Sequence, residues 1–319
     1  MSILSNFLSE QGFVVLDGGL ATELEARGEN LADPLWSAKI LLSEPEKIGD
    51  VHYAYFFAGA DVAITASYQA TFPGLRAAGL TTQQAEEAIR RSVAVAVEAR
   101  ERFWSDARNR SSRLRPLVAA SVGPYGAFLH DGSEYRGAYR VSRGELKAFH
   151  ADRLAVLNDT GADLIACETI PSLLEAEVLT ELLSETQSKE AWISFSCKDD
   201  AHISDGAHFS DAIRVAAQAE QVVAAGVNCT APQFVNALLD QARAVTDKPL
   251  VAYPNSGEQY NAVTCDWRSS MEIGMVEGAA SGWRDRGALL IGGCCRTTPA
   301  TIRGIRAALS GAPAHSESS

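Results

Sequence analysis

Short apolar runs alternate with longer amphipathic stretches along almost the whole chain. The apolar runs lack the strict alternation of a half-exposed strand, so they predict strands buried on both faces, as in parallel sheets. Eight such runs occur, at residues 13–16, 61–65, 117–121, 163–167, 192–196, 224–228, 250–253 and 288–292.

The stretches between these runs carry helix signals. Pro45 stands at a first-turn position, and Ser142 with Glu145 three residues later forms a capping-box pattern. Further helices are predicted at residues 82–102, 146–159, 173–184, 211–218, 232–245, 268–282 and 299–309. Eight strand–helix units in about 300 residues predict an α/β fold of the (β/α)8 TIM-barrel type.

No linker rich in Pro, Gly or Ser divides the chain, so we expect a single barrel domain at residues 1–310 and a disordered tail at 311–319. A doubly wound open sheet is the alternative, but Asp17-Gly18-Gly19 after the first strand does not match its usual GxGxxG fingerprint. The long polar loop at 123–140 contains four aromatic residues, which favours an ordered lid. These are Tyr125, Phe128, Tyr135 and Tyr139.

Charge and composition narrow the classes of partner. The net charge of −12 argues against nucleic acid or an anionic membrane, because both require clustered Lys and Arg. No apolar stretch approaches the roughly 20 residues of a membrane span, and the first residues lack a signal sequence. We therefore expect a cytoplasmic protein whose six cysteines are reduced. Cys167 and Cys197 fall in strand-like runs and are expected in the core, whereas Cys265 has no clear place.

The adjacent residues Cys294 and Cys295 carry the clearest chemical signal. They follow the eighth strand after a Gly pair, and Cys229 follows the sixth. In a barrel the ends of these strands meet on one rim, where barrel enzymes place their active sites. Three sulfurs with one open position are the arrangement of a catalytic rather than a structural zinc. Other polar residues follow strands on the same rim: Asp17, Thr65, Ser67, Gln69, Glu168, Asn228 and Asn255.

Three thiolates make an electron-rich metal centre that is poorly suited to generating hydroxide. Such a centre is better suited to binding a fourth sulfur, because coordination deprotonates a thiol that is otherwise mostly protonated at neutral pH. The pattern therefore predicts alkylation of a thiol substrate.

Six motifs together resemble the homocysteine S-methyltransferase family, over about residues 13–309. They are Asp17-Gly18-Gly19, Ser121-Val122-Gly123-Pro124-Tyr125-Gly126, Glu168-Thr169, Gly226-Val227-Asn228-Cys229, Pro254-Asn255-Ser256-Gly257 and Gly292-Gly293-Cys294-Cys295-Arg296. The resemblance implies a (β/α)8 barrel that holds Zn²⁺ through Cys229, Cys294 and Cys295.

The resemblance also implies the substrates and their contacts. Homocysteine would be the methyl acceptor, its amino group held by Asp17 and Glu168. Its carboxylate would be held by amides near Gly18 and Gly19 together with Thr65. Asn228 is expected to contact the substrate as well.

The loop at 131–137 looks like that of the subgroup whose methyl donor is S-methylmethionine or S-adenosylmethionine. Tyr125, Tyr135 and Trp36 are candidates for holding the sulfonium. Asn255 or Gln69 could supply a metal-binding oxygen when substrate is absent. Gln69 stands where betaine-dependent relatives carry Tyr, and their C-terminal arm is missing, which favours a monomer or weak dimer.

Several alternatives stay open at this stage. The cysteine pair could pack beside a tight Gly turn, and Gly292-Gly293 could bind phosphate. Asp17 could cap the following helix, Glu168 could form a structural ion pair, and Asn255 could be a turn residue only. The domain could present homocysteine to a separate corrinoid methyl carrier, or it could methylate selenocysteine or another thiol.

Overall fold

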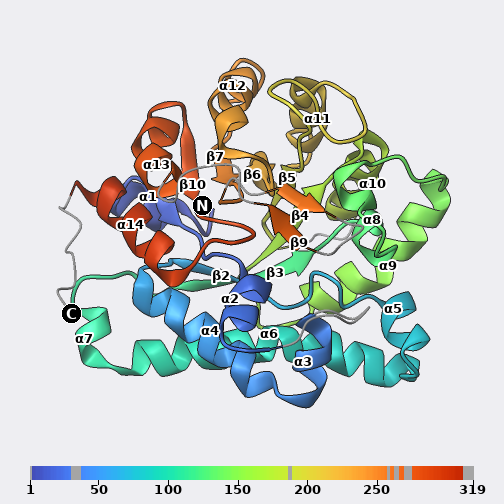
Figure 1. Ribbon diagram of the computed structural model, residues 1–319, viewed down its shortest axis with the longest axis horizontal. Helices are drawn as coiled ribbons and strands as arrows, with labels where there is room; N and C mark the ends of the chain where they lie inside the picture. Colours follow the sequence, from blue (N-terminus) through green and yellow to red (C-terminus); the bar gives the residue numbers. More distant parts are fainter. Residues whose placement is uncertain are drawn as a thin grey trace.

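The computed structural model describes residues 2–29, 37–185, 189–256, 259–261, 266–268 and 275–311. In these ranges the eight expected strands form one sheet in the order β1-β10-β7-β6-β5-β4-β3-β2, and neighbouring strands pair in parallel. Figure 1 shows the strands enclosed by helices. The strands are β1 (Val14–Val15), β2 (Val62–Ile64), β3 (Leu117–Val122), β4 (Leu164–Ile170), β5 (Ala191–Phe195), β6 (Val222–Asn228), β7 (Leu250–Tyr253) and β10 (Ala288–Ile291).

The first and last strands of this order also meet, which closes the sheet into a barrel. Leu16 forms a parallel bridge with Val62, and the backbone N–H of Asp17 donates to the carbonyl of Val62 at 3.0 Å. The backbone N–H of Asp61 donates to the carbonyl of Val15. The predicted (β/α)8 barrel is therefore confirmed.

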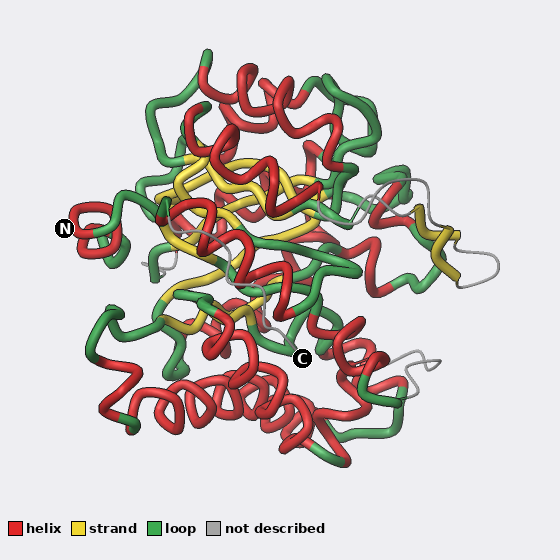
Figure 2. Tube along the Cα trace, turned by 60° about the vertical axis from the view of Figure 1, so that its left-hand side comes forward, coloured by secondary structure: helices red, strands yellow, loops and turns green. Residues whose placement is uncertain are grey.

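Helices cover the outside of the strands, as Figure 2 shows. The main ones are α4 (Pro45–Ala58), α6 (Thr82–Ser105), α9 (Arg143–Asn158), α10 (Leu173–Glu185), α11 (Phe209–Ala216), α12 (Pro232–Arg243), α13 (Met275–Asp285) and α14 (Pro299–Ser310). Pro45 occupies the first turn of α4 as expected. The capping box at Ser142 and Glu145 is present at the start of α9.

One predicted helix begins in the wrong place. The helix expected at 268–282 starts only at Met275, and Arg268 belongs to β9 (Asp266–Arg268), which pairs antiparallel with β8 (Gln259–Asn261). Tyr260 and Trp267 are opposite each other in this hairpin, and aromatic residues favour strands. Trp36, Cys265 and the expected tail from residue 312 onward lie outside the described residues.

Alternate strand residues fill the interior of the barrel. A buried cluster collects residues from six strands or their ends, together with Leu4 and Phe7 near α1 (Ser5–Glu10). The strand residues are Val14, Leu16, Val62, Leu164, Trp192, Val251, Tyr253 and Leu290. A second and larger cluster joins the outward-facing strand residues to the helices. Because the interior is packed with side chains, ligand chemistry is confined to the rims.

A buried ion cluster ties the barrel together at the start of β2. The Asp61 carboxylate is fully buried and pairs with Arg113 at 3.2 Å and with Arg306 of α14. It also accepts hydrogen bonds from the backbone N–H of Val15 and from the side chain of Gln11. One carboxylate therefore links the first strand, the second strand and the last helix.

We predict that Asp61→Asn lowers the free energy of unfolding by about 3 kcal/mol, because two partly buried guanidinium groups lose their fully buried counter-ion. Urea unfolding followed by circular dichroism measures this loss. The control Asp50→Asn removes an ion pair with Arg102 in which both side chains are more than half exposed, and it should cost less than about 1 kcal/mol. Equal losses in the two variants would contradict the assigned role of Asp61.

Candidate metal centre and substrate site

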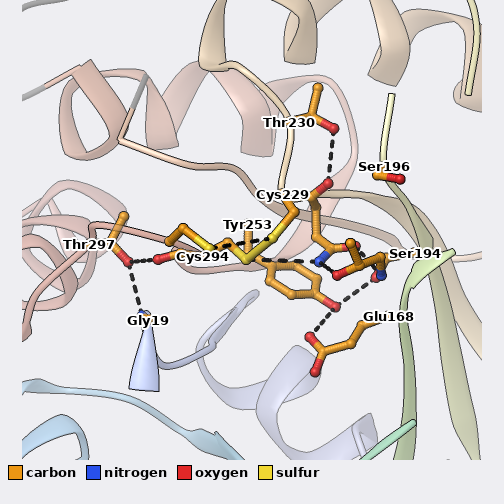
Figure 3. Close-up of a disulfide and its surroundings, with 12 residues drawn as sticks. Gly19, Glu168, Ser194, Ser196, Cys229, Thr230, Tyr253, Cys294 and Thr297 are labelled. Carbon is orange, nitrogen blue, oxygen red and sulfur yellow. Dashed lines mark hydrogen bonds between the residues drawn. A yellow bond between two sulfur atoms is a disulfide. The ribbon is translucent and has the colours of Figure 1, made fainter. Parts of the chain in front are cut away.

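Three cysteines from two loops meet at the carboxyl ends of the strands. Cys229 follows β6 directly, and Cys294 and Cys295 follow β10. Their sulfur atoms all lie within 4.8 Å of one another, and Figure 3 shows Cys229 and Cys294 facing each other. The structure thus brings together the three residues that the sequence predicts as metal ligands. Three sulfur donors at this separation fit a soft metal such as zinc.

Two of these sulfurs are joined in the structure. A disulfide links Cys229 to Cys294, whose Cα atoms are 5.5 Å apart, and the Cys295 sulfur lies 3.9 Å from that of Cys229. The expectation that all six cysteines are reduced is therefore wrong for this pair. The physical reason is proximity, because a Cα separation of this size is typical of bridged cysteines. Metal binding by all three sulfurs requires this bond to be reduced.

The backbone around the cysteines is held in an uncommon conformation. Cys229, Thr169 and Arg296 have φ values of 46°, 60° and 65°. These lie in the left-handed region that residues other than Gly seldom adopt. All three immediately follow or include a candidate site residue, and backbone strain of this kind persists where the surrounding structure fixes it.

The glycines of the two motifs allow the loops after β1 and β10 to touch. A Cβ on Gly19 would lie 2.7 Å from the carbonyl oxygen of Cys294, and one on Gly293 would lie 2.3 Å from the Thr297 hydroxyl. The Thr297 hydroxyl in turn accepts from the backbone N–H of Gly19 at 3.3 Å. Gly19 and Gly293 therefore allow tight packing. This packing brings the loop that follows Asp17 into contact with the loop that carries Cys294.

The Glu168 carboxylate belongs to a buried hydrogen-bond network. Among the described residues it forms no ion pair. Its carboxylate accepts from the hydroxyls of Ser121 and Tyr253, and Tyr253 is itself bonded to Trp192 and Ser194. Burial raises the pKa of Glu168 to about 7, although the two hydroxyl donors act in the opposite direction. The sequence does not predict Ser121, Ser194 and Tyr253 as supports of this carboxylate.

Asp17 lies close enough to Glu168 for their charges to interact. Its carboxylate accepts from the backbone N–H of Ile64 at 2.9 Å. Burial raises its pKa well above the ordinary value, and the neighbouring Glu168 raises it further. The helix that follows, α2 (Leu20–Ala26), has Gly19 at its N-cap and no side-chain cap, so Asp17 does not cap it.

Two expected substrate residues are engaged by the protein itself. Asn228 accepts from the backbone N–H of Thr169 and donates to its hydroxyl, each at 2.7 Å. The Thr65 hydroxyl accepts from the backbone N–H of Ser121 at 3.0 Å and pairs with Ser67. In this structure both side chains hold the ends of β3 and β4, which carry Ser121 and Glu168.

Asn255 and Gln69 each keep a buried side-chain oxygen without a hydrogen-bond partner. The backbone N–H of Asn255 donates to the carbonyl of Thr230, and that of Ser256 donates to the carbonyl of Cys295. Asn255 is therefore held between the two cysteine loops. An orphaned buried oxygen is costly, and that of Asn255 lies where the two cysteine loops meet.

The lid expected at 123–140 is built around its own aromatic core. Tyr125 packs on Phe128, Tyr139 and Phe149 at centroid distances of 5.7, 5.4 and 5.0 Å. Its backbone N–H donates to the buried Glu175 at 2.6 Å. Tyr125 thus anchors the lid, whereas Tyr135 forms a hydrogen bond with Cys295.

A chain of buried hydrogen bonds holds the lid against α9 and α10. Arg153 donates to the carbonyl of Gly123 at 2.6 Å and to Nδ1 of His150 at 3.0 Å. His150 therefore carries its proton on Nε2, which lies 2.7 Å from the Glu175 carboxylate. Burial lowers the pKa of His150 and raises that of Glu175 to about 8. The sequence does not predict this support, because its members are spread over α9 and α10.

Comparison with known proteins supplies the family. The family model for homocysteine S-methyltransferase matches residues 14–309. The chain belongs to the homocysteine S-methyltransferase family. Homocysteine S-methyltransferase YbgG from Bacillus subtilis is 50% identical over 307 residues, covering 96% of this chain and 98% of the relative.

Two solved structures of the homocysteine methyltransferase MmuM from Escherichia coli are also similar. Its metallated form has a TM-score of 0.86 and 46% identity, covering 95% of this chain and 99% of that one. Its oxidized form has a TM-score of 0.86 and 47% identity, covering 95% and 98%. Within the described residues, no helix of this chain is both long and apolar enough to cross a membrane.

The raised pKa of Glu168 predicts a pH-dependent cost in stability. Because the folded-state pKa is about 7 against an ordinary 4.5, the stability that the neutral carboxyl provides is complete below about pH 4.5 and is lost as pH rises through 7. Without substrate, Glu168→Gln should be more stable than the unmodified protein by up to about 3 kcal/mol at pH 8.5. The difference should shrink toward zero at pH 5.

Urea unfolding at several pH values measures this difference. The control Glu10→Gln, at an exposed position, should change stability little at any pH. A Glu168→Gln variant that is less stable at pH 8.5 than at pH 5, relative to the unmodified protein, would contradict the assignment.

Proposed function

We propose that this chain is a zinc-dependent methyltransferase that moves a methyl group from a sulfonium donor to the sulfur of homocysteine, forming methionine. The donor is S-methylmethionine, with S-adenosylmethionine as the second candidate. The observation that carries the proposal is the gathering of three cysteine sulfurs within 4.8 Å on the same barrel rim as two interacting buried carboxyls. Family membership supports homocysteine as the acceptor.

Cys229, Cys294 and Cys295 would hold the zinc, with the Asn255 oxygen as a fourth ligand when substrate is absent. The related MmuM has a metallated form, which supports the binding of a metal. When bound, zinc lowers the pKa of a thiol ligand, so that the substrate thiol is present as a thiolate at neutral pH. Three thiolate donors match this role better than the activation of water.

Glu168 and Asp17 would bind the ammonium group of homocysteine. A protonated amine needs acceptors, and its positive charge would favour the ionised form of a carboxyl whose pKa burial has raised. Ser121 and Tyr253 hold the Glu168 carboxylate in place. Amides near Gly18 and Gly19, together with Thr65, would take the substrate carboxylate, and Asn228 would also contact the substrate.

The methyl group then passes between two sulfur atoms in line. The electron pair of the homocysteine sulfur forms the new S–C bond, and the electrons of the broken bond remain on the donor sulfur, which becomes a neutral thioether. The thiol proton is released to solvent. Because the sulfonium charge disappears, a strong anionic clamp on it would stabilise the ground state more than the transition state. Aromatic faces are a milder way to hold it.

The three cysteines must be reduced to bind metal, which fits a cytoplasmic location. We propose that the protein acts as a monomer or weak dimer on small molecules, without a nucleic-acid or membrane partner, and contributes to methionine synthesis.

The metal proposal predicts about one zinc per chain in freshly reduced protein, measured by elemental analysis. Cys294→Ser should lower the zinc content, because one thiolate ligand of the metal is lost. The rate of methyl transfer should fall at least about 100-fold, while the circular dichroism spectrum stays unchanged. Cys197→Ser, outside the cluster, is the control and should retain zinc. Full activity without any bound metal would refute the metal's role.

The donor proposal predicts methionine formation from homocysteine and S-methylmethionine by the purified reduced protein alone. Competition between S-methylmethionine and S-adenosylmethionine would give the ratio of the two kcat/KM values. Strict dependence on an added corrinoid protein would instead assign the chain as a homocysteine-binding module. A higher kcat/KM with selenocysteine in place of homocysteine would reassign the acceptor.

A further inference from the structure

Glu134 lies on a short helical turn that the structure fixes against the lid. This turn, η1 (Ser133–Tyr135), packs on α8 (Tyr125–Phe128). A Cβ on Gly126 would lie only 2.6 Å from the backbone nitrogen of Glu134, so the contact requires Gly. The Ser196 hydroxyl, after β5, donates to the carbonyl of Glu134 at 2.8 Å. The position of Glu134 is therefore set from two sides.

One oxygen of the Glu134 carboxyl forms no hydrogen bond within the protein. Its Oε2 atom is buried and has no hydrogen-bond partner, and burial raises its pKa to about 7. The nearby Arg136 pairs instead with Asp131 at 3.5 Å. A buried oxygen without a partner is costly, and the mechanism described above does not employ it.

The same carboxyl lies beside the metal centre and two aromatic rings. Glu134 directly precedes Tyr135, whose side chain forms a hydrogen bond with Cys295. The side chain of Tyr68 forms a hydrogen bond with Thr169, the residue after Glu168. The Tyr68 ring is packed on Gly123, where a Cβ would lie 2.7 Å from a ring carbon. An acid and two phenol rings thus converge next to Cys295, and Glu168 with Asp17 forms a separate pair of acids.

We propose that Glu134 binds the α-ammonium group of the methyl donor, which makes it a determinant of donor specificity. This inference rests on the proposed function. A sulfonium donor derived from methionine carries two positive charges, and only the sulfonium charge disappears during transfer. A carboxylate on the ammonium stabilises the ground state and the transition state alike, so it tightens donor binding without slowing the methyl transfer.

The two phenol rings would then lie along the sulfonium end of the donor. Aromatic faces attract a cation without forming a full ion pair, which suits a charge that has to vanish. The acceptor's ammonium has its own acids in Asp17 and Glu168. In this proposal, Asp17 and Glu168 bind the amino group of homocysteine, and Glu134 binds the amino group of the donor. No carboxylate is placed against the sulfonium.

The test is the steady-state kinetics of Glu134→Gln with S-methylmethionine and homocysteine. Loss of a charge-assisted hydrogen bond should raise the KM for S-methylmethionine about 10- to 100-fold. The kcat and the KM for homocysteine should stay within about threefold of the unmodified enzyme. Asp131→Asn removes a charge from the same loop at an exposed position and should leave the donor KM within about twofold.

A donor without the amino group separates recognition of the ammonium from general effects. For 3-dimethylsulfoniopropionate, the kcat/KM, or the competitive inhibition constant where transfer is undetectable, should be the same for the unmodified enzyme and Glu134→Gln. Equal losses with both sulfonium compounds would overturn the inference in favour of a structural role. A raised KM for homocysteine alone would assign Glu134 to the acceptor, which also overturns it.

Failure of the underlying function would look different. In that case the unmodified, zinc-loaded enzyme would form no methionine from either sulfonium compound, and the inference would fall with the proposed function.

Discussion

The closure of the barrel at its shortest strand is the constraint on which the site depends. β1 contributes only Val14 and Val15 to the sheet ladder, yet it joins β10 to β2 through backbone bonds and through the side chains of Asp17 and Asp61. Closure places β10, the last strand of the barrel, beside β1, the first. The cysteine loop after β10 can therefore lie against Gly19, and residues almost 280 positions apart share one rim.

The rim contains acids whose burial opposes folding. The pKa values of Glu168 and Asp17 are raised chiefly by burial, so ionising them in the folded protein costs free energy. Cys229 itself, Thr169 after Glu168 and Arg296 after Cys295 also have left-handed backbone conformations. The large strand-to-helix core and the buried Asp61 cluster offset these costs. Unfavourable groups concentrated at one rim are typical of a site organised for binding ligands.

Much of the fold and part of the site could be predicted from the sequence. Continuous apolar runs located all eight barrel strands, and the parallel topology alone placed Cys229 near Cys294 and Cys295. The β8–β9 hairpin was missed because its residues precede a helix without a clear break in pattern. The sequence did not predict that the side chains of Thr65 and Asn228, which we expect to contact substrate, also hold Ser121 and Thr169. Such partnerships depend on side-chain directions that neither periodicity nor spacing encodes.

The proposed reaction gives a reason for the different surroundings of the charged groups. Both amino groups keep their positive charge from start to finish, so pairing them with carboxylates affects all states equally. The sulfonium loses its charge as the bond forms, so a carboxylate held against it would favour the reactant over the transition state. Phenol rings beside Cys295, with Glu134 and Glu168 within electrostatic reach, separate these two requirements. In the proposed site, the geometry that would bind the donor thereby leaves the transferring methyl group free of the strongest attractions.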